Sequence, residues 1–206
     1  MSLNSIAIAP VNGSKPKYLL VGLHGWGSNA EDLAALVPSL NLPNCQFIFP
    51  NAPFAHPQVP GGKAWYALED RSYRGLSESR DILKEFLESL KKNTGIPLSQ
   101  TILIGFSQGG AMTLDVGLNL PLAGLCSLSG YLHSSISVGE AADCPPVLIV
   151  HGDRDLVVPI QAAIAARERL TEMGVTVQYQ EFAMGHEIIP AAIALLEKFI
   201  FARSLG

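Results

Sequence analysis

The sequence predicts an α/β fold in which a mostly parallel sheet of about seven strands is covered by helices on both faces. Short apolar runs alternate with longer segments of helical periodicity along the chain, an order typical of such sheets. The composition, with 48% hydrophobic and 16% charged residues, is that of a globular protein. A length of 206 residues suits one domain, which we expect to span residues 1–206.

The expected strands are short apolar runs, because a strand buried on both faces is apolar throughout. Ligands of such folds bind where the parallel strands end, so the chemistry is sought in the loops that follow them. The predicted strands are Tyr18–Leu23, Gln46–Phe49, Thr101–Gly105, Leu122–Leu128, Pro146–His151 and Val175–Phe182.

The expected helices carry apolar residues three and four positions apart. The clearest one, Ser77–Lys92, has two lysines in its last turn and Gly95 just beyond it, both typical of a helix C-terminus. The others are Asn29–Leu40, a helix from about Gln108, Ile160–Met173, and Ile188–Ala202 with a proline in its first turn.

Composition argues against several classes of partner. The formal net charge of −4 disfavours nucleic acid and anionic membrane surfaces, because both select basic patches. No apolar run is long enough to span a bilayer, and the N-terminus lacks the basic segment of a signal peptide. Cys45, Cys126 and Cys144 are too scattered for a disulfide framework or a zinc site. We therefore expect a cytoplasmic protein without a metal or an integral membrane segment.

The segment Gly105–Gly109 is the only G-x-S-x-G pattern in the chain. It follows an expected strand and opens an expected helix, which is the setting of a nucleophile elbow. In that turn a strained serine presents its hydroxyl above the sheet, and small flanking residues avoid collision with neighbouring backbone. The pattern predicts Ser107 as a nucleophile rather than the cap of a glycine-rich turn.

A serine hydroxyl needs a base, and histidine is the usual one because its ordinary pKa lies near neutrality. Elbow hydrolases place the partners in the order serine, acid, histidine. His186 lies in a loop between the last strand and the last helix, at the sheet edge expected for Ser107, and is the predicted base. The other candidates are His24, His56, His133 and His151, of which His24 and His151 are expected in structural roles.

The acid, which orients the imidazole, is sought directly after the strand that ends at His151. Asp153 and Asp155 both lie there. Spacing alone leaves the choice between them open, and one of the two is expected to form the turn or cap a helix.

Acyl transfer also requires two backbone N–H groups directed at the developing oxyanion. One normally belongs to the residue after the nucleophile, here Gln108. The other comes from a loop after an early strand, here Leu23–Gly27, whose glycines permit the turn. We expect Leu23 to be that donor.

Two rival functions are weaker. Gly25–Ala30 also matches the G-x-G-x-x-G/A fingerprint of a nicotinamide-dependent oxidoreductase. Such an enzyme needs an acidic residue at the end of the next strand, where this chain has Pro50 and Asn51. A non-catalytic binding protein usually lacks a triad member, and all three are present here. An enzyme of the dienelactone hydrolase type would carry cysteine in place of Ser107.

The motifs resemble, in content and order, those of the phospholipase/carboxylesterase family, which includes the acyl-protein thioesterases and small bacterial carboxylesterases. The resemblance runs from about Lys17 to Phe199. It is carried by Leu23–Gly27, Pro50–Pro53, Ala64–Tyr66, Gly105–Gly110, Leu128–Tyr131, His151–Pro159 and Gly185–Glu187.

The resemblance implies an α/β-hydrolase without a large lid domain, which needs no cofactor or metal and cleaves carboxylic esters or thioesters of apolar acyl groups. In the family pattern H-G-x-x-D-x-x-V-P the acid is the second aspartate, Asp155, and the early oxyanion donor falls on Leu23. Trp26–Asn29 differs from the acyl-protein thioesterases, and Phe54–Leu68 lacks their Met-rich run. Both differences favour a small-molecule esterase, with acyl-protein thioesterase or lysophospholipase activity as the alternative.

An acyl pocket needs apolar walls. Its substrate is expected to be a small-molecule ester or thioester, and surface patches of such an apolar chain are compatible with a homodimer. The residues expected to form the pocket are Trp26, Phe54, Trp65, Tyr66, Leu156 and Val157.

Overall fold

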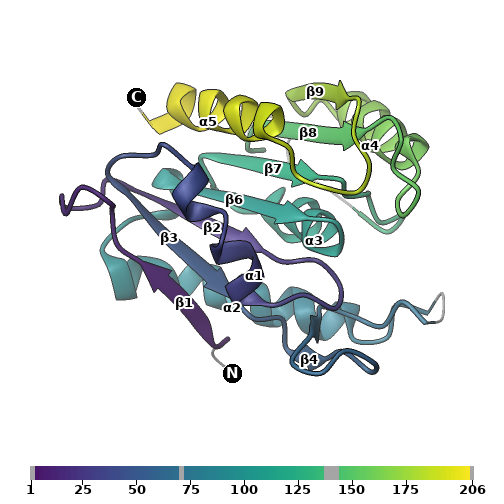
Figure 1. Ribbon diagram of the computed structural model, residues 1–206, viewed down its shortest axis with the longest axis horizontal. Coiled ribbons are helices and arrows are strands. Elements are labelled where there is room, and N and C mark those ends of the chain that lie inside the picture. Colours follow the sequence, from purple (N-terminus) through teal and green to yellow (C-terminus); the bar gives the residue numbers. More distant parts are fainter. Residues whose placement is uncertain (1–2, 70–71, 137–143, 205–206) are drawn as a thin grey trace.

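A computed structural model describes residues 3–69, 72–136 and 144–204. Seven strands form one sheet in the order β1-β3-β2-β6-β7-β8-β9 (Figure 1). The pairing is parallel except between β1 and β3, which confirms the predicted fold class. The strands of the sheet are β1 (Ser5–Ile8), β2 (Tyr18–Leu23), β3 (Cys45–Pro50), β6 (Thr101–Phe106), β7 (Gly124–Leu128), β8 (Val147–Gly152) and β9 (Val177–Phe182).

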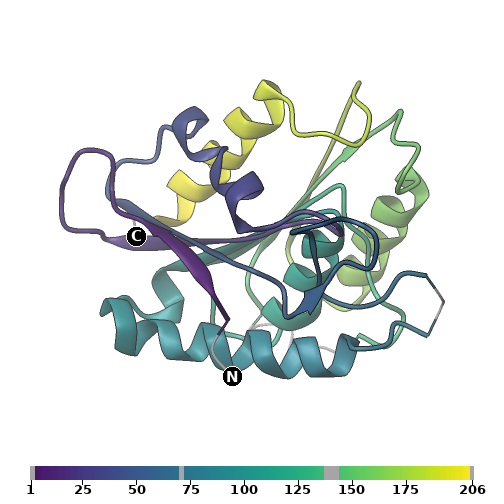
Figure 2. The ribbon, with the colours of Figure 1, turned by 60° about the horizontal axis from the view of Figure 1, so that its bottom comes forward.

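Helices cover both faces of this sheet, α1 and α5 on one side and α2, α3 and α4 on the other (Figure 2). Successive residues of a strand point to opposite faces, so β2 sends Leu19 and Val21 into one core and Leu20 into the other. The helices are α1 (Ala30–Ala34), α2 (Leu76–Thr94), α3 (Gln108–Gly117), α4 (Ile160–Glu172) and α5 (Pro190–Ser204), with short 3₁₀ turns η1 (Val37–Ser39) and η2 (Leu98–Gln100).

The predicted helix over Asn29–Leu40 is wrong in its second half. Asn29 caps α1 by accepting a hydrogen bond from the backbone of Asp32, but the helix ends at Ala34 and a 3₁₀ turn follows. Pro38 has no N–H group to donate to the carbonyl of Ala34, four residues earlier, which explains why the α-helix stops there and a 3₁₀ turn follows.

Three strands lie outside the predicted set. β1 is a four-residue antiparallel edge strand, too short for its alternation to stand out in the sequence. β4 (Phe54–Ala55) and β5 (Lys63–Ala64) pair as a separate hairpin. This hairpin contributes Phe54 and Ala64 to the cavity described below.

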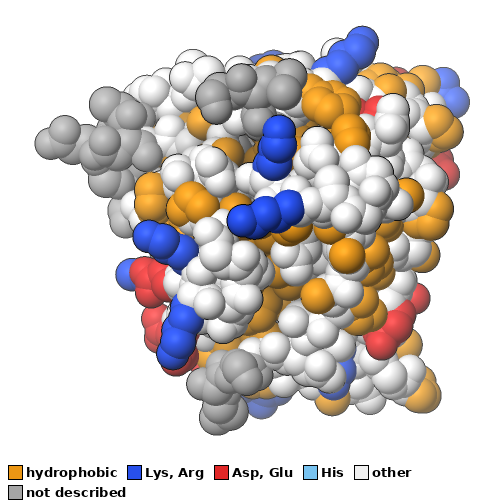
Figure 3. Space-filling model, turned by 90° about the vertical axis from the view of Figure 1, so that its left-hand side faces the viewer, with side chains coloured by type: hydrophobic (Ala, Val, Ile, Leu, Met, Phe, Trp, Pro, Cys, Tyr) orange, Lys and Arg blue, Asp and Glu red, His pale blue; other side chains and the backbone are white. Residues whose placement is uncertain are grey.

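The parallel strands begin and end at opposite poles of the molecule. β6, β8 and β9 end at one edge, so the loops that carry Ser107, Asp155 and His186 all start there. The opposite pole faces the viewer in Figure 3. A groove at that pole is lined by polar and apolar side chains, among them Lys15 and Lys17. The catalytic candidates are thus gathered at one end.

Candidate active site

Ser107 stands in a strained turn between β6 and α3. Its φ of 55° and ψ of −118° are uncommon for a residue other than glycine. A Cβ atom on Gly105 would lie 2.1 Å from the carbonyl oxygen of Gly109, and one on Gly109 would lie 2.1 Å from that of Leu23. Both positions therefore require glycine, as the elbow pattern predicts.

Ser107, His186 and Asp155 form one continuous hydrogen-bonded chain. The Oγ of Ser107 lies 3.0 Å from Nε2 of His186, and Nδ1 of His186 lies 2.7 Å from Oδ2 of Asp155. Because a carboxylate only accepts, the neutral imidazole carries its proton on Nδ1 and leaves Nε2 free to accept the serine proton. The structure brings together the three residues that the sequence singled out.

Asp155, and not Asp153, lies against the histidine. The side chain of Asp155 is fully buried, whereas that of Asp153 is 45% exposed. Burial alone would raise the pKa of the Asp155 carboxyl, but hydrogen bonds from His186 and from the backbone N–H groups of Val158 and Val157 lower that pKa below its ordinary value. The acid is therefore held as a carboxylate, the form that orients the imidazole.

Two further histidines hold the loops around this site. Nε2 of His151 lies 2.8 Å from the carbonyl oxygen of Val158 and 3.4 Å from Oδ2 of Asp155, so His151 supports the loop of the acid. Nε2 of His24 accepts the backbone N–H of Ala52 at 3.0 Å, and burial lowers the pKa of His24. Both are structural partners, with His151 also in contact with the acid.

Gln108, the residue after the nucleophile, uses its side chain to tie a distant segment to the start of α3. Its Nε2 donates to the carbonyl oxygen of Tyr66, and its Oε1 accepts from the backbone N–H of Trp65, both at 2.9 Å. No sequence motif indicates this clamp, because the two segments lie far apart along the chain.

The loop after β2 reaches the nucleophile beyond the predicted donor. Leu23 is the last residue of β2, fully buried and in register with Gly105 of β6. A Cβ atom on Gly25 would lie 3.4 Å from Cβ of Ser107. The backbone of Gly25 therefore runs close to the nucleophile.

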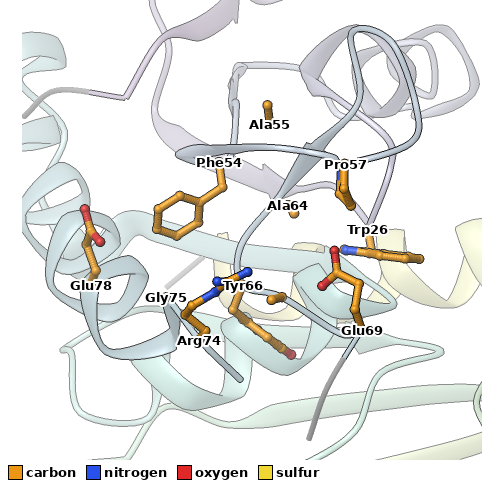
Figure 4. Close-up of a pocket in the computed structure, with 11 residues that line it drawn as sticks. Trp26, Phe54, Ala55, Pro57, Ala64, Tyr66, Glu69, Arg74, Gly75 and Glu78 are labelled. Carbon is orange, nitrogen blue, oxygen red and sulfur yellow. The ribbon is translucent and has the colours of Figure 1, made fainter. Parts of the chain in front are cut away.

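A cavity of about 480 Å³ adjoins this loop and the hairpin (Figure 4). Of the predicted pocket residues, Trp26, Phe54 and Tyr66 line it. The lining is therefore aromatic on several sides, as an apolar acyl group requires. Charged side chains also line it, namely Glu69, Arg74 and Glu78.

Three predicted pocket residues do not line this cavity. Trp65 is fully buried in the core, and its indole Nε1 donates to the carbonyl oxygen of His24 at 3.0 Å. Leu156 and Val157, on the loop after β8, are 96% and 66% exposed. They follow the acid in sequence, but they are not among the residues that line the cavity. An apolar pattern cannot distinguish a core tryptophan from a pocket one.

A second aspartate–histidine–hydroxyl chain ends on Tyr66. Nδ1 of His133 lies 3.1 Å from Oδ2 of Asp115 in α3, and Nε2 of His133 lies 3.0 Å from the Tyr66 hydroxyl. No motif in the sequence indicates a role for Asp115 or His133, because the two lie in separate segments of the chain.

The glycine loop that matched a dinucleotide fingerprint is occupied by the protein's own groups. The N–H of Gly27 donates to the carbonyl oxygen of Lys63, and the N–H of Ala30 donates to Oδ1 of Asn51. A bound pyrophosphate would need such donors at the start of the helix. The oxidoreductase hypothesis is therefore unsupported.

Across residues 3–69, 72–136 and 144–204, no group of three or more histidine, cysteine, aspartate or glutamate side chains could hold a metal ion. In the same part of the chain, no helix has both the length and the apolar character needed to cross a membrane.

The sheet, the serine elbow and the order of the triad define an α/β-hydrolase. The sequence profile described as Phospholipase/Carboxylesterase matches residues 5–203. The chain belongs to the phospholipase/carboxylesterase family and is a hydrolase of that carboxylesterase and thioesterase group. The family resemblance seen in the sequence is confirmed.

Individual relatives agree with this assignment. Acyl-protein thioesterase 1 of Neurospora crassa is 32% identical over 202 residues, covering 87% of this chain and 81% of the relative. The protein of the same name from Saccharomyces cerevisiae is 31% identical over 200 residues, covering 85% of each chain. The crystal structure of esterase PE8 is 32% identical with a TM-score of 0.89, covering 98% of this chain and 100% of that one. The Bacillus cereus carboxylesterase shares the fold, with a TM-score of 0.82, 16% identity and coverage of 98% and 94%.

Proposed function

We propose that this hydrolase cleaves carboxylic esters of apolar acyl groups, and thioesters of the same acyl groups, through an acyl-enzyme on Ser107. The observation that carries the proposal is the unbroken chain of contacts from Ser107 through His186 to Asp155, at 3.0 and 2.7 Å. A strained elbow presents the serine, and an ionised carboxylate holds the histidine. These are the parts of a serine nucleophile with its base and its orienting acid.

In the first half-reaction Ser107 Oγ attacks the carbonyl carbon of the substrate while Nε2 of His186 takes the hydroxyl proton. The carbonyl electron pair moves onto oxygen and forms a tetrahedral oxyanion. When the oxyanion collapses, the bond to the leaving alcohol or thiol breaks, and His186 returns the proton to that group. The acyl group remains on Ser107 as an ester.

The oxyanion is stabilised by backbone N–H groups. Gln108 supplies one from the first turn of α3, where helix N–H groups have no partner within the helix. The second belongs to the loop after β2. Leu23 is the donor that the sequence predicts. The Gly25 backbone passes close to Ser107, where an added Cβ atom would lie 3.4 Å from Cβ of the serine, and this favours the N–H of Trp26, the next peptide in that loop.

In the second half-reaction a water molecule attacks the acyl-enzyme. His186 accepts a proton from this water, and a second oxyanion forms at the same donors. Its collapse breaks the bond to Ser107, His186 returns the proton to the serine oxygen, and the carboxylic acid leaves. Asp155 stabilises the imidazolium in both half-reactions.

The cavity favours a compact apolar acyl group carried by a small-molecule ester. Its aromatic lining supplies apolar walls, and the short segment Phe54–Leu68 forms much of that lining. The names of the Neurospora and yeast relatives make acyl-protein thioester cleavage the second candidate. Lysophospholipase activity is the third, because the family description includes phospholipases.

The decisive experiment is hydrolysis of p-nitrophenyl esters from acetate to palmitate, with Ser107→Ala beside the wild type. We expect turnover that peaks at short or middle chains and is lost in the variant. An acyl-thioester series of the same lengths distinguishes ester from thioester preference. A folded wild type that cleaves neither series would contradict the proposal.

We also propose a cytoplasmic location and a homodimer. Cys45 and Cys126 are buried as thiols, which suits a reducing compartment. Fractionation of the source cells tests the location. Light scattering on the purified chain tests the dimer, and a monomeric mass at micromolar concentration would exclude it.

A further inference from the structure

A buried hydrogen-bonded network holds the aromatic ring that lines the cavity. The Tyr66 hydroxyl lies 3.0 Å from Nε2 of His133 and 2.5 Å from the hydroxyl of Tyr131. Tyr66 is fully buried, and His133 is 4% exposed. Because Tyr66 and His133 are removed from solvent, contacts within the protein largely decide how the Tyr66 ring lies.

His133 joins the two ends of this network. Its Nδ1 lies 3.1 Å from Oδ2 of Asp115, and its Nε2 lies 3.0 Å from the Tyr66 hydroxyl. The Tyr66 hydroxyl therefore has two partners from other segments, His133 and Tyr131. Two partners at one hydroxyl restrict the orientation of the Tyr66 ring.

Asp115 is itself anchored as a carboxylate. Nε and Nη2 of Arg80 donate to its two oxygens at 2.7 and 3.0 Å. Burial alone would raise the pKa of Asp115, but the hydrogen bonds from His133 and Arg80 lower that pKa below its ordinary value. The network therefore ends on a charged acceptor, which makes its hydrogen bonds strong.

Helix α3 holds Tyr66 at a second point, through its first residue. Gln108 and Asp115 lie seven residues apart in α3 and so on one face of the helix. Gln108 binds the backbone of Tyr66 directly, and Asp115 holds its hydroxyl through His133. The helix that begins at the nucleophile thus fixes both ends of the residue that lines the cavity.

We propose that Asp115, His133 and Tyr131 are positioning residues that hold Tyr66 as a rigid wall of the acyl cavity and so make Tyr66 determine acyl-chain length. The proposal rests on the proposed function, because it assigns this cavity to the acyl group. A rigid wall costs little ordering when a chain binds against it. A longer acyl group reaches further into the cavity than an acetyl group does, so octanoate should be the more sensitive to the position of this wall.

The test compares wild type with Tyr66→Phe, which removes the hydroxyl and keeps the ring. The ratio of KM for p-nitrophenyl octanoate to KM for the acetate should rise about three- to tenfold, the loss expected for one or two buried hydrogen bonds, with a smaller change in kcat. Asp115→Asn should shift the ratio in the same direction. The double variant should do no more than the stronger single variant, because both act through one network.

Tyr179→Phe is the matched control. The Tyr179 hydroxyl also donates a hydrogen bond, to Glu181 at 2.8 Å, but from β9 and outside the cavity. Its KM ratio should equal that of the wild type. If Tyr66→Phe and Asp115→Asn lower only the melting temperature and leave the ratio unchanged, the network is merely structural and the proposal is wrong.

Calorimetric binding of octanoate and acetate separates this proposal from the proposed function. Weaker octanoate binding by Tyr66→Phe, with acetate as the reference, supports the wall whether or not esters are cleaved. Equal octanoate affinity in the wild type and Tyr66→Phe overturns it. A wild type that binds octanoate and cleaves no ester overturns the proposed function alone.

Discussion

Two chains of aspartate, histidine and hydroxyl in this protein share the same order of atoms and differ in their surroundings. In the chain from Asp155 to Ser107, the intervening histidine side chain is 17% exposed. In the chain from Asp115 to Tyr66, the intervening His133 side chain is 2% exposed. One chain opens to the catalytic edge, and the other is closed inside the protein.

The terminal hydroxyls show what this difference means chemically. Ser107 sits on a strained turn beside the first N–H groups of α3, where an oxyanion can be stabilised. Tyr66 bonds to Tyr131, and burial raises the pKa of the Tyr66 hydroxyl, so it keeps its proton. An aspartate–histidine pair thus activates a nucleophile only where the hydroxyl that it contacts faces a substrate site. In the buried series, the same kind of pair holds the Tyr66 side chain in place.

The largest expected effect is that of Ser107→Ala. Removing the nucleophile should lower kcat by about 10⁴- to 10⁶-fold, as loss of a triad serine does. The thermal midpoint should remain close to wild type, because no core contact is lost. Stopped-time assays with a middle-chain p-nitrophenyl ester measure the loss. Near-normal turnover would show that Ser107 is not the nucleophile and that the two aspartate–histidine–hydroxyl series have been assigned the wrong roles.

Asp155→Asn should lower kcat by about 10⁴-fold, because the amide favours the wrong imidazole tautomer. Asp153→Asn is the matched control: its side chain is 45% exposed, so kcat should stay close to wild type. Steady-state kinetics on both variants measure the ranking. The reverse order would place the acid at Asp153.

Asp115→Asn should show the opposite balance, with a large loss of stability and a far smaller loss of kcat than Asp155→Asn. Breaking this ion pair, buried on the aspartate side, should lower the free energy of unfolding at pH 7 by about 3 kcal/mol. The pKa of Asp115 is lowered in the folded protein, so its ion pair stabilises the fold fully at pH values above the ordinary carboxyl pKa. This stabilisation is lost as the pH falls through the pKa that Asp115 has in the folded protein.

Urea denaturation at pH 7 and at pH 3.5 checks this sign. The difference between wild type and Asp115→Asn should shrink at the lower pH, because the wild-type carboxyl begins to protonate and then resembles the amide. A difference that grows on acidification would contradict the ionised state of Asp115.

The smallest expected effect is that of Tyr131→Phe. It removes one partly buried hydrogen bond to Tyr66 and should lower the free energy of unfolding by about 1 kcal/mol. Burial raises the pKa of Tyr131 to about 12, so the cost should be constant from pH 6 to 9. Chemical denaturation across that range measures it. A loss that disappears within this range would show that the hydroxyl ionises there.

Much of the fold and the triad could be predicted from local sequence. Continuous apolar runs and helical periodicity identified six of the strands in the sheet and the positions of the helices, and the small residues around Ser107 identified the elbow. The choice of Asp155 over Asp153 needed the family resemblance. The break after Ala34 was missed because the apolar spacing continues to Leu40, although Pro38 cannot donate the α-helical hydrogen bond to Ala34.

The sequence by itself determined the alternation of strands and helices, the nucleophile and the order of its partners, because sterics and periodicity act within a few neighbouring residues. Only the tertiary structure decided that Trp65 fills the core while Tyr66 lines the cavity. It also decided that Asp115 meets Arg80 and that His133 meets Tyr66, 35 and 67 residues apart along the chain. A buried hydrogen bond forms between any two polar groups that packing brings within about 3 Å of each other. The residues next to each group in the sequence do not show which distant group that will be.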